Sequence, residues 1–171
     1  MPQDELVDIV DEKGNFIKVV TKREAHEKGL LHKTVIGEVI DSNGRWLMTR
    51  QSKSKQDAGQ YVSAVGGHVS SGETEIEALK KEAREEVGIE GDFKYEFVGR
   101  IILNRYVVGR QENHFFVVYK IYSDKKPVTN DEIENYKYFT EEELKKELKE
   151  NPKSFGDAFH FLLENFFPNL K

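Results

Sequence analysis

Residues 67–89, GHVSSGETEIEALKKEAREEVGI, constrain the fold of this chain more than any other segment. They begin with a glycine turn and continue as a helix-forming run that stops at Gly88. Within the run, Glu82, Glu85 and Glu86 have i, i+3 and i+4 spacing, so a helix places their carboxylates on one face. Beside them lies an apolar stripe of Ile76, Leu79, Ala83 and Val87. The stripe predicts a helix packed on a core. The carboxylates repel one another, so the helix either tolerates that cost or binds a cation.

Five short β-prone runs precede this helix, and turn signals separate them. A polar turn between the first two predicts an N-terminal hairpin, and Asn43-Gly44 predicts a second hairpin. Thr21 and Glu24 have the spacing of a capping box, which predicts a short helix after the first hairpin. The predicted strands are Leu6–Val10, Phe16–Thr21, 34–41, 45–50 and 61–65.

After this helix, the sequence predicts further strands and then helices. Thr140 and Glu143 form another capping-box pattern, which opens a helix that runs to about residue 149. The aromatic-rich run 155–167 predicts a terminal helix that packs on the core, or alternatively a homodimer surface. The other predicted segments are strands at 93–98 and 99–108 with a bend between them, a polar turn at 109–113, a central strand at 115–121 and a loop at 127–135.

The order of these elements predicts one domain over residues 1–171, which is long enough to bury a substantial core. Mixed strands with one helix in mid-chain and helices at the end indicate an α/β sandwich with a mixed sheet, rather than regular βαβ alternation. We expect an N-terminal extension over residues 1–33 and C-terminal helices over residues 140–171.

The overall composition excludes several classes of function. A formal net charge of -5 argues against nonspecific binding of nucleic-acid polymers. The absence of cysteine excludes disulfides, thiolate metal sites and cysteine nucleophiles. No apolar run approaches the ~18 residues that span a bilayer, and the N-terminus lacks the pattern of a signal peptide. We therefore expect a cytoplasmic protein that acts on a small molecule away from membranes.

The spacing of Gly67, Glu73, Lys81 and the residues from Glu82 to Ile89 resembles the Nudix box, G-x5-E-x7-R-E-U-x-E-E-x-G-U, where U is a bulky aliphatic residue. Seven of its nine fixed positions match. The departures are Lys81 in place of arginine and Ala83 in place of the bulky aliphatic residue. The resemblance implies a Nudix α/β/α sandwich. It also implies divalent-metal-dependent hydrolysis of a pyrophosphate linkage in a nucleoside diphosphate derivative or another organic diphosphate.

The same resemblance assigns roles to the matching residues. Glu82, Glu85 and Glu86 correspond to metal ligands, and the carbonyl group of Gly67 often joins them. Mg²⁺ suits such a site because it prefers oxygen ligands and bridges phosphate oxygens, and Mn²⁺ is the second candidate. Glu73 and Lys81 would orient these acids, although a lysine ammonium lacks the planar fork of arginine. One of Glu85, Glu86 or Glu112 would act as the general base.

A second resemblance covers the segments AHEKGLLHK, WLMTRQSKSK and YVSAVGGHVSSGE, which are similar to isopentenyl diphosphate isomerases, themselves Nudix-fold proteins. Those isomerases carry a catalytic cysteine before the Gly-His pair, where this chain has Gly66. The resemblance therefore implies a hydrolase related to the isomerases. Two alternatives stay open. One is isomerase activity by a route without cysteine, and the other is a degenerate domain that binds a nucleotide as a sensor.

The isomerase resemblance also nominates residues outside the box. His68 matches an isomerase metal ligand, His32 matches through its Leu-His pair, and His26 is offset by one position. Neutral imidazole suits zinc or manganese better than magnesium. Glu112 aligns with a further metal ligand in the same resemblance. As a residue of an isolated turn, however, it would face solvent.

The polar, lysine-rich run 51–60 is predicted as a loop. Arg50 and Lys55, at the start of and within this run, match diphosphate contacts of the isomerases. Charge-assisted contacts of this kind orient phosphates, but a solvated loop is the simpler alternative.

Overall fold

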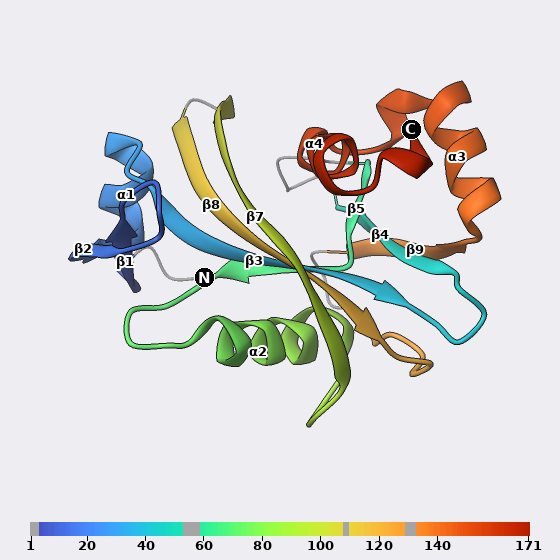
Figure 1. Ribbon diagram of the computed structural model, residues 1–171, viewed down its shortest axis with the longest axis horizontal. Coiled ribbons are helices and arrows are strands. Elements are labelled where there is room, and N and C mark those ends of the chain that lie inside the picture. The colour runs from blue at the N-terminus through green and yellow to red at the C-terminus, as the bar shows by residue number, and fades with distance from the viewer. Residues whose placement is uncertain (1–3, 53–58, 108–109, 129–132) are drawn as a thin grey trace.

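The chain folds into a sandwich in which helices cover both faces of one sheet (Figure 1). The computed structural model describes residues 4–52, 59–107, 110–128 and 133–171. Helix α2 (Glu75–Val87) lies on one side of the sheet, and α3 (Glu141–Glu150) and α4 (Asp157–Phe166) lie on the other. Nearly all of the strand pairs are antiparallel, but β3 (His32–Ile40) and β8 (Arg110–Tyr122) run parallel. The predicted α/β class and mixed sheet are confirmed.

The remaining elements have the following bounds: β1 (Leu6–Val10), β2 (Phe16–Thr21), α1 (Lys22–Lys28), β4 (Trp46–Gln51), β5 (Tyr61–Ser63), β6 (Val65–His68), β7 (Lys94–Val107), β9 (Ile133–Phe139) and two 3₁₀ turns at Pro152–Ser154 and Pro168–Leu170. Strand β3 lies at the centre, because β1, β4, β6 and β8 all pair with it. None of the helices in the described ranges is both long and apolar enough to cross a membrane.

Local signals in the sequence account for the helix ends. The Thr74 side chain accepts a hydrogen bond from the Glu77 backbone and the Glu77 carboxylate accepts one from the Thr74 backbone, which completes a capping box at the start of α2. The same arrangement at Thr140 and Glu143 starts α3, as the sequence predicts. Gly88 ends α2 in the left-handed conformation at φ 72°, where a side chain would be strained.

Alternate side chains of β3 face opposite layers, and this alternation divides the core. Val35 and Val39 pack with Leu79 and Ala83 of α2. Ile36, on the opposite face, packs with Leu162 of α4. Because β3 carries apolar residues on both faces, it is held in the middle of the sandwich and fixes the position of every strand paired with it.

Four predicted details differ from the structure, all in strands. Residues 94–107 form one strand with an irregular register between Phe97 and Gly99, rather than two strands. Strand β8 begins at Arg110, so the expected polar turn is strand in its described part. Strand β9, whose first residues the sequence predicts as a loop, pairs with β4 and buries Phe139. Gly66 and Gly67 lie within β6, whereas the sequence predicts a turn.

A buried carboxyl group on β3 leads to a prediction about pH. Glu38 is 1% exposed, its Oε2 accepts a hydrogen bond from the Ser63 hydroxyl (3.1 Å), and its Oε1 has no hydrogen-bond partner among the described residues. Burial raises the pKa of Glu38 from 4.5 to about 7, against the lowering effect of Ser63. The folded state therefore retains a proton that the unfolded state releases as pH rises from 4.5 to 7, so stability falls across that window.

We expect Glu38→Gln to remove this loss, because an amide does not ionise. The free energy of unfolding, measured with urea at pH 5 and pH 8, should fall less with pH in the variant than in the wild type, by at most about 3 kcal/mol. Glu142→Gln, at an exposed position of α3, is the control and should follow the wild type. Parallel profiles for Glu38→Gln and wild type would contradict the raised pKa.

Candidate metal-dependent active site

The box carboxylates lie along α2 with different exposure. Glu82 is 3% exposed, Glu86 is half-buried and Glu85 is exposed. Glu82 lies against Gly67 of β6, where an added Cβ would be 2.2 Å from the Glu82 carboxyl carbon. Glycine is therefore required at position 67 to make room for this carboxylate. Gly67 lies in β6 and not in the turn that the sequence predicts.

The electrostatics of Glu82 fit a cation. Burial, together with the charges of Glu86 and Glu85, raises the pKa of Glu82 to about 8, and the charge of Lys81 opposes this rise. Its Oε1 is buried and accepts no hydrogen bond from the described residues. A buried acceptor beside two further carboxylates suits a hard divalent cation, which prefers oxygen ligands. The residues at this place thus fit the metal that their spacing predicts.

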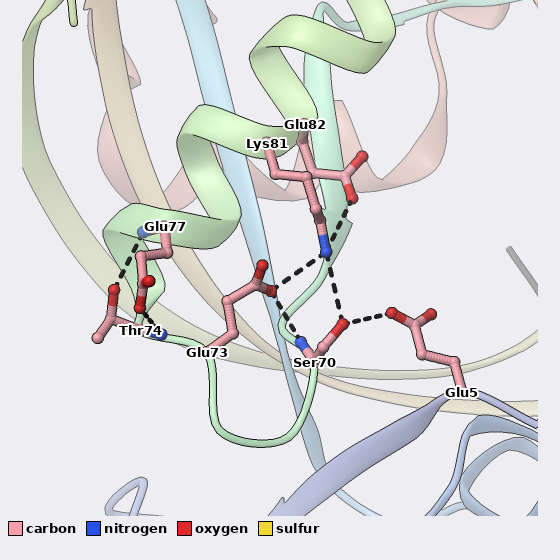
Figure 2. Close-up of polar contacts among 7 residues, drawn as sticks. All are labelled: Glu5, Ser70, Glu73, Thr74, Glu77, Lys81 and Glu82. Carbon is pink, nitrogen blue, oxygen red and sulfur yellow. Dashed lines mark hydrogen bonds and ion pairs between the residues drawn. The ribbon is translucent and has the colours of Figure 1, made fainter. Parts of the chain in front are cut away.

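Lys81 is tied to the loop that precedes α2 (Figure 2). Its ammonium lies 3.2 Å from Glu73 Oε1 and 3.4 Å from the Ser70 hydroxyl. It lies farther, at 4.0 Å, from Glu82 Oε1. Glu73 Oε1 also accepts a hydrogen bond from the Ser70 backbone (3.0 Å). The structure thus places Glu73 and Lys81 together beside Glu82.

Histidines from four separate elements converge at one end of the sheet. His26 comes from α1, His32 from β3, His68 from β6 and His114 from β8. One ligand atom from each lies within 4.8 Å of the others. The sheet register explains the convergence, because His32 pairs with His114 and Thr34 pairs with His68. The structure therefore brings together His26, His32 and His68, and it adds His114. We call these four residues the histidine cluster.

Hydrogen bonds orient the imidazoles of the histidine cluster. His32 Nδ1 lies 2.8 Å from the Leu30 carbonyl oxygen, to which it donates, so Nε2 carries the lone pair. His32 Nε2 and His68 Nε2 are buried with no hydrogen-bond partner among the described residues. Burial lowers the pKa of His32 to about 3 and lowers that of His68 well below its usual value, with neighbouring histidines adding to both effects. Neutral imidazoles with unused lone pairs are the form that binds transition metals.

Glu112 lies beside the histidine cluster. It is 3% exposed, and its Oε2 lies 3.0 Å from His114 Nε2 and 3.9 Å from His26 Nε2. The expectation of a solvent-facing turn is wrong, because β8 extends through this position. The sequence resemblances do not nominate His114. Its signal is its position two residues after Glu112, which on a strand places both side chains on one face.

Of the two predicted phosphate contacts, Arg50 lies among the residues that the structure describes. Arg50, on β4, donates from Nε to the Gly59 carbonyl oxygen (3.0 Å), and its guanidinium lies 5.8 Å from the centre of the Tyr61 ring. Lys55 lies outside the described residues. Arg50 is half-buried, and these contacts fix its position at the start of the loop.

Comparison with known proteins identifies the family. The NUDIX domain family matches residues 30–159. This chain belongs to the NUDIX family. The match confirms the family predicted from the box and the predicted enzyme class, a Nudix-type phosphoanhydride hydrolase.

Some relatives of this NUDIX protein are named as isomerases, and others are named as Nudix hydrolases. Isopentenyl-diphosphate Delta-isomerase 1 of Aromatoleum aromaticum is 34% identical over 160 residues, which cover 91% of this chain and 86% of the relative. An uncharacterized Nudix hydrolase of Nostoc sp. is 32% identical over 142 residues, which cover 80% and 82%. A crystal structure from Deinococcus radiodurans has a TM-score of 0.75 at 24% identity, over 95% of this chain and 99% of the other, and shows the same fold. The predicted likeness to the isomerase-related subgroup is confirmed.

Proposed function

We propose that this NUDIX protein is a divalent-metal-dependent hydrolase of an organic diphosphate, such as a nucleoside diphosphate derivative. The observation that carries the proposal is the buried, unused Oε1 of Glu82 beside Gly67, with Glu85 and Glu86 on the same helix. Glu82, Glu86 and the Gly67 carbonyl group would hold the cation, with Mg²⁺ as the first candidate and Mn²⁺ as the second. When bound, the ion polarises phosphate oxygens and lowers the pKa of water.

The chain's own residues would perform the remaining tasks. Glu85 and Glu86 are less buried than Glu82, so either can accept a proton from the attacking water. Arg50 would orient the diphosphate through its guanidinium, together with Lys55 from the adjacent loop. Lys81 and Glu73 would hold the loop that precedes α2 in place against the helix. Glu112 would serve the histidine cluster instead of acting as the general base.

The histidine cluster would hold a second, softer metal ion. Its candidate ligands are four imidazole nitrogens, and the Glu112 carboxylate lies beside them, a set that favours zinc, manganese or another transition metal over magnesium. His32 and His68 offer unused Nε2 atoms. The hydrogen bond from His32 to Leu30 provides the outer support that metal-binding histidines usually have. His68 directly follows Gly67, so the two proposed sites are adjacent in the chain.

The test is a phosphate-release screen over nucleoside diphosphates, nucleoside diphosphate derivatives and isoprenoid diphosphates, with Mg²⁺ or Mn²⁺ present. We expect metal-dependent cleavage of at least one compound and none after treatment with a chelator. Absence of cleavage with either metal would contradict the proposal. A nucleotide complex that stays uncleaved for hours with Mg²⁺ would instead support the sensor.

Isomerisation of an isoprenoid diphosphate is the second candidate, and the histidine cluster favours it because the resemblance to isomerases includes three of its residues. Gly66, however, provides no acid or base where those isomerases have cysteine. We expect no dimethylallyl product when the protein is incubated with isopentenyl diphosphate. Appearance of that product would replace the hydrolase proposal.

A further inference from the structure

The segment at the start of β1 reaches the loop that precedes α2. The Ser70 hydroxyl donates a short hydrogen bond to Glu5 Oε1 (Figure 2). The backbone reinforces this contact, because Val7 forms a β-bridge with Ser70 and the Ser71 N–H donates to the Leu6 carbonyl oxygen (2.8 Å). Residues more than 60 positions apart are therefore held together, and the N-terminal segment becomes part of the box region.

Ser70 connects Glu5 to Lys81. Because the Ser70 hydroxyl proton is used by Glu5, the oxygen of that hydroxyl presents its lone pairs to the Lys81 ammonium at 3.4 Å. Glu73 Oε1 accepts from the same ammonium at 3.2 Å. Two oxygens thus hold the ammonium on the loop side of α2, as Figure 2 shows.

The position of the ammonium determines whether Lys81 forms a hydrogen bond with Glu82. The ammonium forms only a long ion pair with Glu82 Oε1, at 4.0 Å, which is beyond hydrogen-bonding distance, and that oxygen has no hydrogen-bond partner among the described residues. A lysine side chain is flexible and can rotate toward a carboxylate, which an arginine held by two bonds does less readily. If Lys81 moved by about 1 Å, it would form a charge-assisted hydrogen bond with Glu82 and compete with a metal ion for that oxygen.

We propose that Glu5 is a positioning residue of the cation site. By fixing the Ser70 hydroxyl, it keeps Lys81 out of hydrogen-bonding distance of Glu82 and leaves Glu82 Oε1 available to a divalent cation. The inference rests on the proposed function, since it concerns the carboxylate site assigned there. It explains how lysine can replace the arginine of the family pattern, because a residue outside the box restrains its ammonium.

The test measures Mn²⁺ binding by electron paramagnetic resonance without substrate, counting only the site that disappears in Glu82→Gln. We expect Glu5→Ala to weaken this site about 3- to 10-fold, and Glu5→Gln, which still accepts from Ser70, to stay within about twofold of the wild type. Asp8→Ala is the matched control, because Asp8 accepts from the Ser71 hydroxyl (2.6 Å) of the same loop, whereas Glu5 accepts from the Ser70 hydroxyl. It should leave Mn²⁺ affinity unchanged even where it lowers the melting temperature.

The same measurement in a Lys81→Met variant distinguishes the positioning role of Glu5 from a loss of folding. In Lys81→Met there is no ammonium to compete for Glu82, so adding Glu5→Ala should cause no further loss of Mn²⁺ affinity. An equal loss in both backgrounds would overturn the proposal, as would an equal effect of Asp8→Ala and Glu5→Ala. If the wild type shows no Mn²⁺ site that depends on Glu82, the proposed function itself fails. That result is distinct from a site that is present but insensitive to Glu5.

Discussion

Glu86→Gln should lose phosphohydrolase activity by about 10³-fold or more in kcat while its fold stays intact. Glu86 follows Glu82 by one helical turn, and its charge is the largest contribution to the raised pKa of Glu82 after burial. An amide is the same size as the carboxylate and preserves packing. It removes one negative charge from the site that would bind the cation, so metal affinity and the stabilisation of developing charge decrease together.

The melting temperature distinguishes this outcome from damage to the fold. Without metal, the carboxylates of the box repel one another, and relief of one such pair is worth about 0.2–0.5 kcal/mol. The metal-free variant should therefore be as stable as the wild type or slightly more stable. A stabilised but inactive protein is what a functional cluster of like charges predicts.

Glu90→Gln provides the matched control for this substitution. It makes the same chemical change four positions later, at an exposed residue beyond the end of α2. Its turnover should equal that of the wild type. If Glu86→Gln also keeps wild-type turnover with Mg²⁺, the box carboxylates are not the metal ligands of the reaction, and the mechanism proposed above is wrong.

The carboxylate site could be predicted because all of its parts are local in sequence. Helical spacing fixes the relation of Glu82 to Glu86, and the capping box and Gly88 fix the ends of α2. The reason for Gly67 could not be predicted in the same way. Its missing side chain makes room for Glu82, and that contact depends on how β6 packs against α2.

The histidine cluster could be predicted only in part, because it depends on sheet topology. The sequence nominates His26, His32 and His68 through a resemblance to isomerases. His114 is 82 residues from His32, and only the parallel pairing of β3 with β8 brings the two side chains together. A polar run such as the one that starts β8 resembles a turn when it is considered alone. In the fold, two of its side chains, Glu112 and Asn113, contact the cluster and α1 respectively.

Removing one imidazole should nearly abolish transition-metal binding at the histidine cluster. We expect the metal-free protein to bind Co²⁺ with a visible absorption band, and His32→Asn to weaken that affinity about 100-fold or more. His32 is fully buried, its Nδ1 is held by the Leu30 carbonyl oxygen and its Nε2 faces the other rings without a partner. Its ring centre lies 5.0 Å from that of His68 and 4.9 Å from that of His114, so its loss opens the middle of the cluster.

Thermal stability provides an independent measurement. A ligand at 100 times its dissociation constant stabilises the folded state by about 2.7 kcal/mol, which raises the melting temperature of a domain of this size by about 5–10 °C. We expect this rise for the wild type with Co²⁺ or Zn²⁺, and a rise of less than about 2 °C for His32→Asn. His160→Asn is the matched control, because His160 is the fifth histidine of the chain and bonds the Pro152 carbonyl oxygen on the C-terminal side of the molecule.

The two variants together decide whether the cluster is a metal site or a packed polar core. If it is a metal site, His160→Asn binds Co²⁺ as the wild type does, and His32→Asn loses the absorption band and the thermal shift together. If it is a packed core, metal changes neither protein, and His32→Asn is simply less stable because it leaves a space among buried rings. Burial of the neutral imidazoles of His32 and His68 costs folding free energy because their Nε2 atoms have no hydrogen-bond partner among the described residues. That cost is offset when a metal ion accepts the unused lone pairs of His32 and His68, and for this reason we expect the first result.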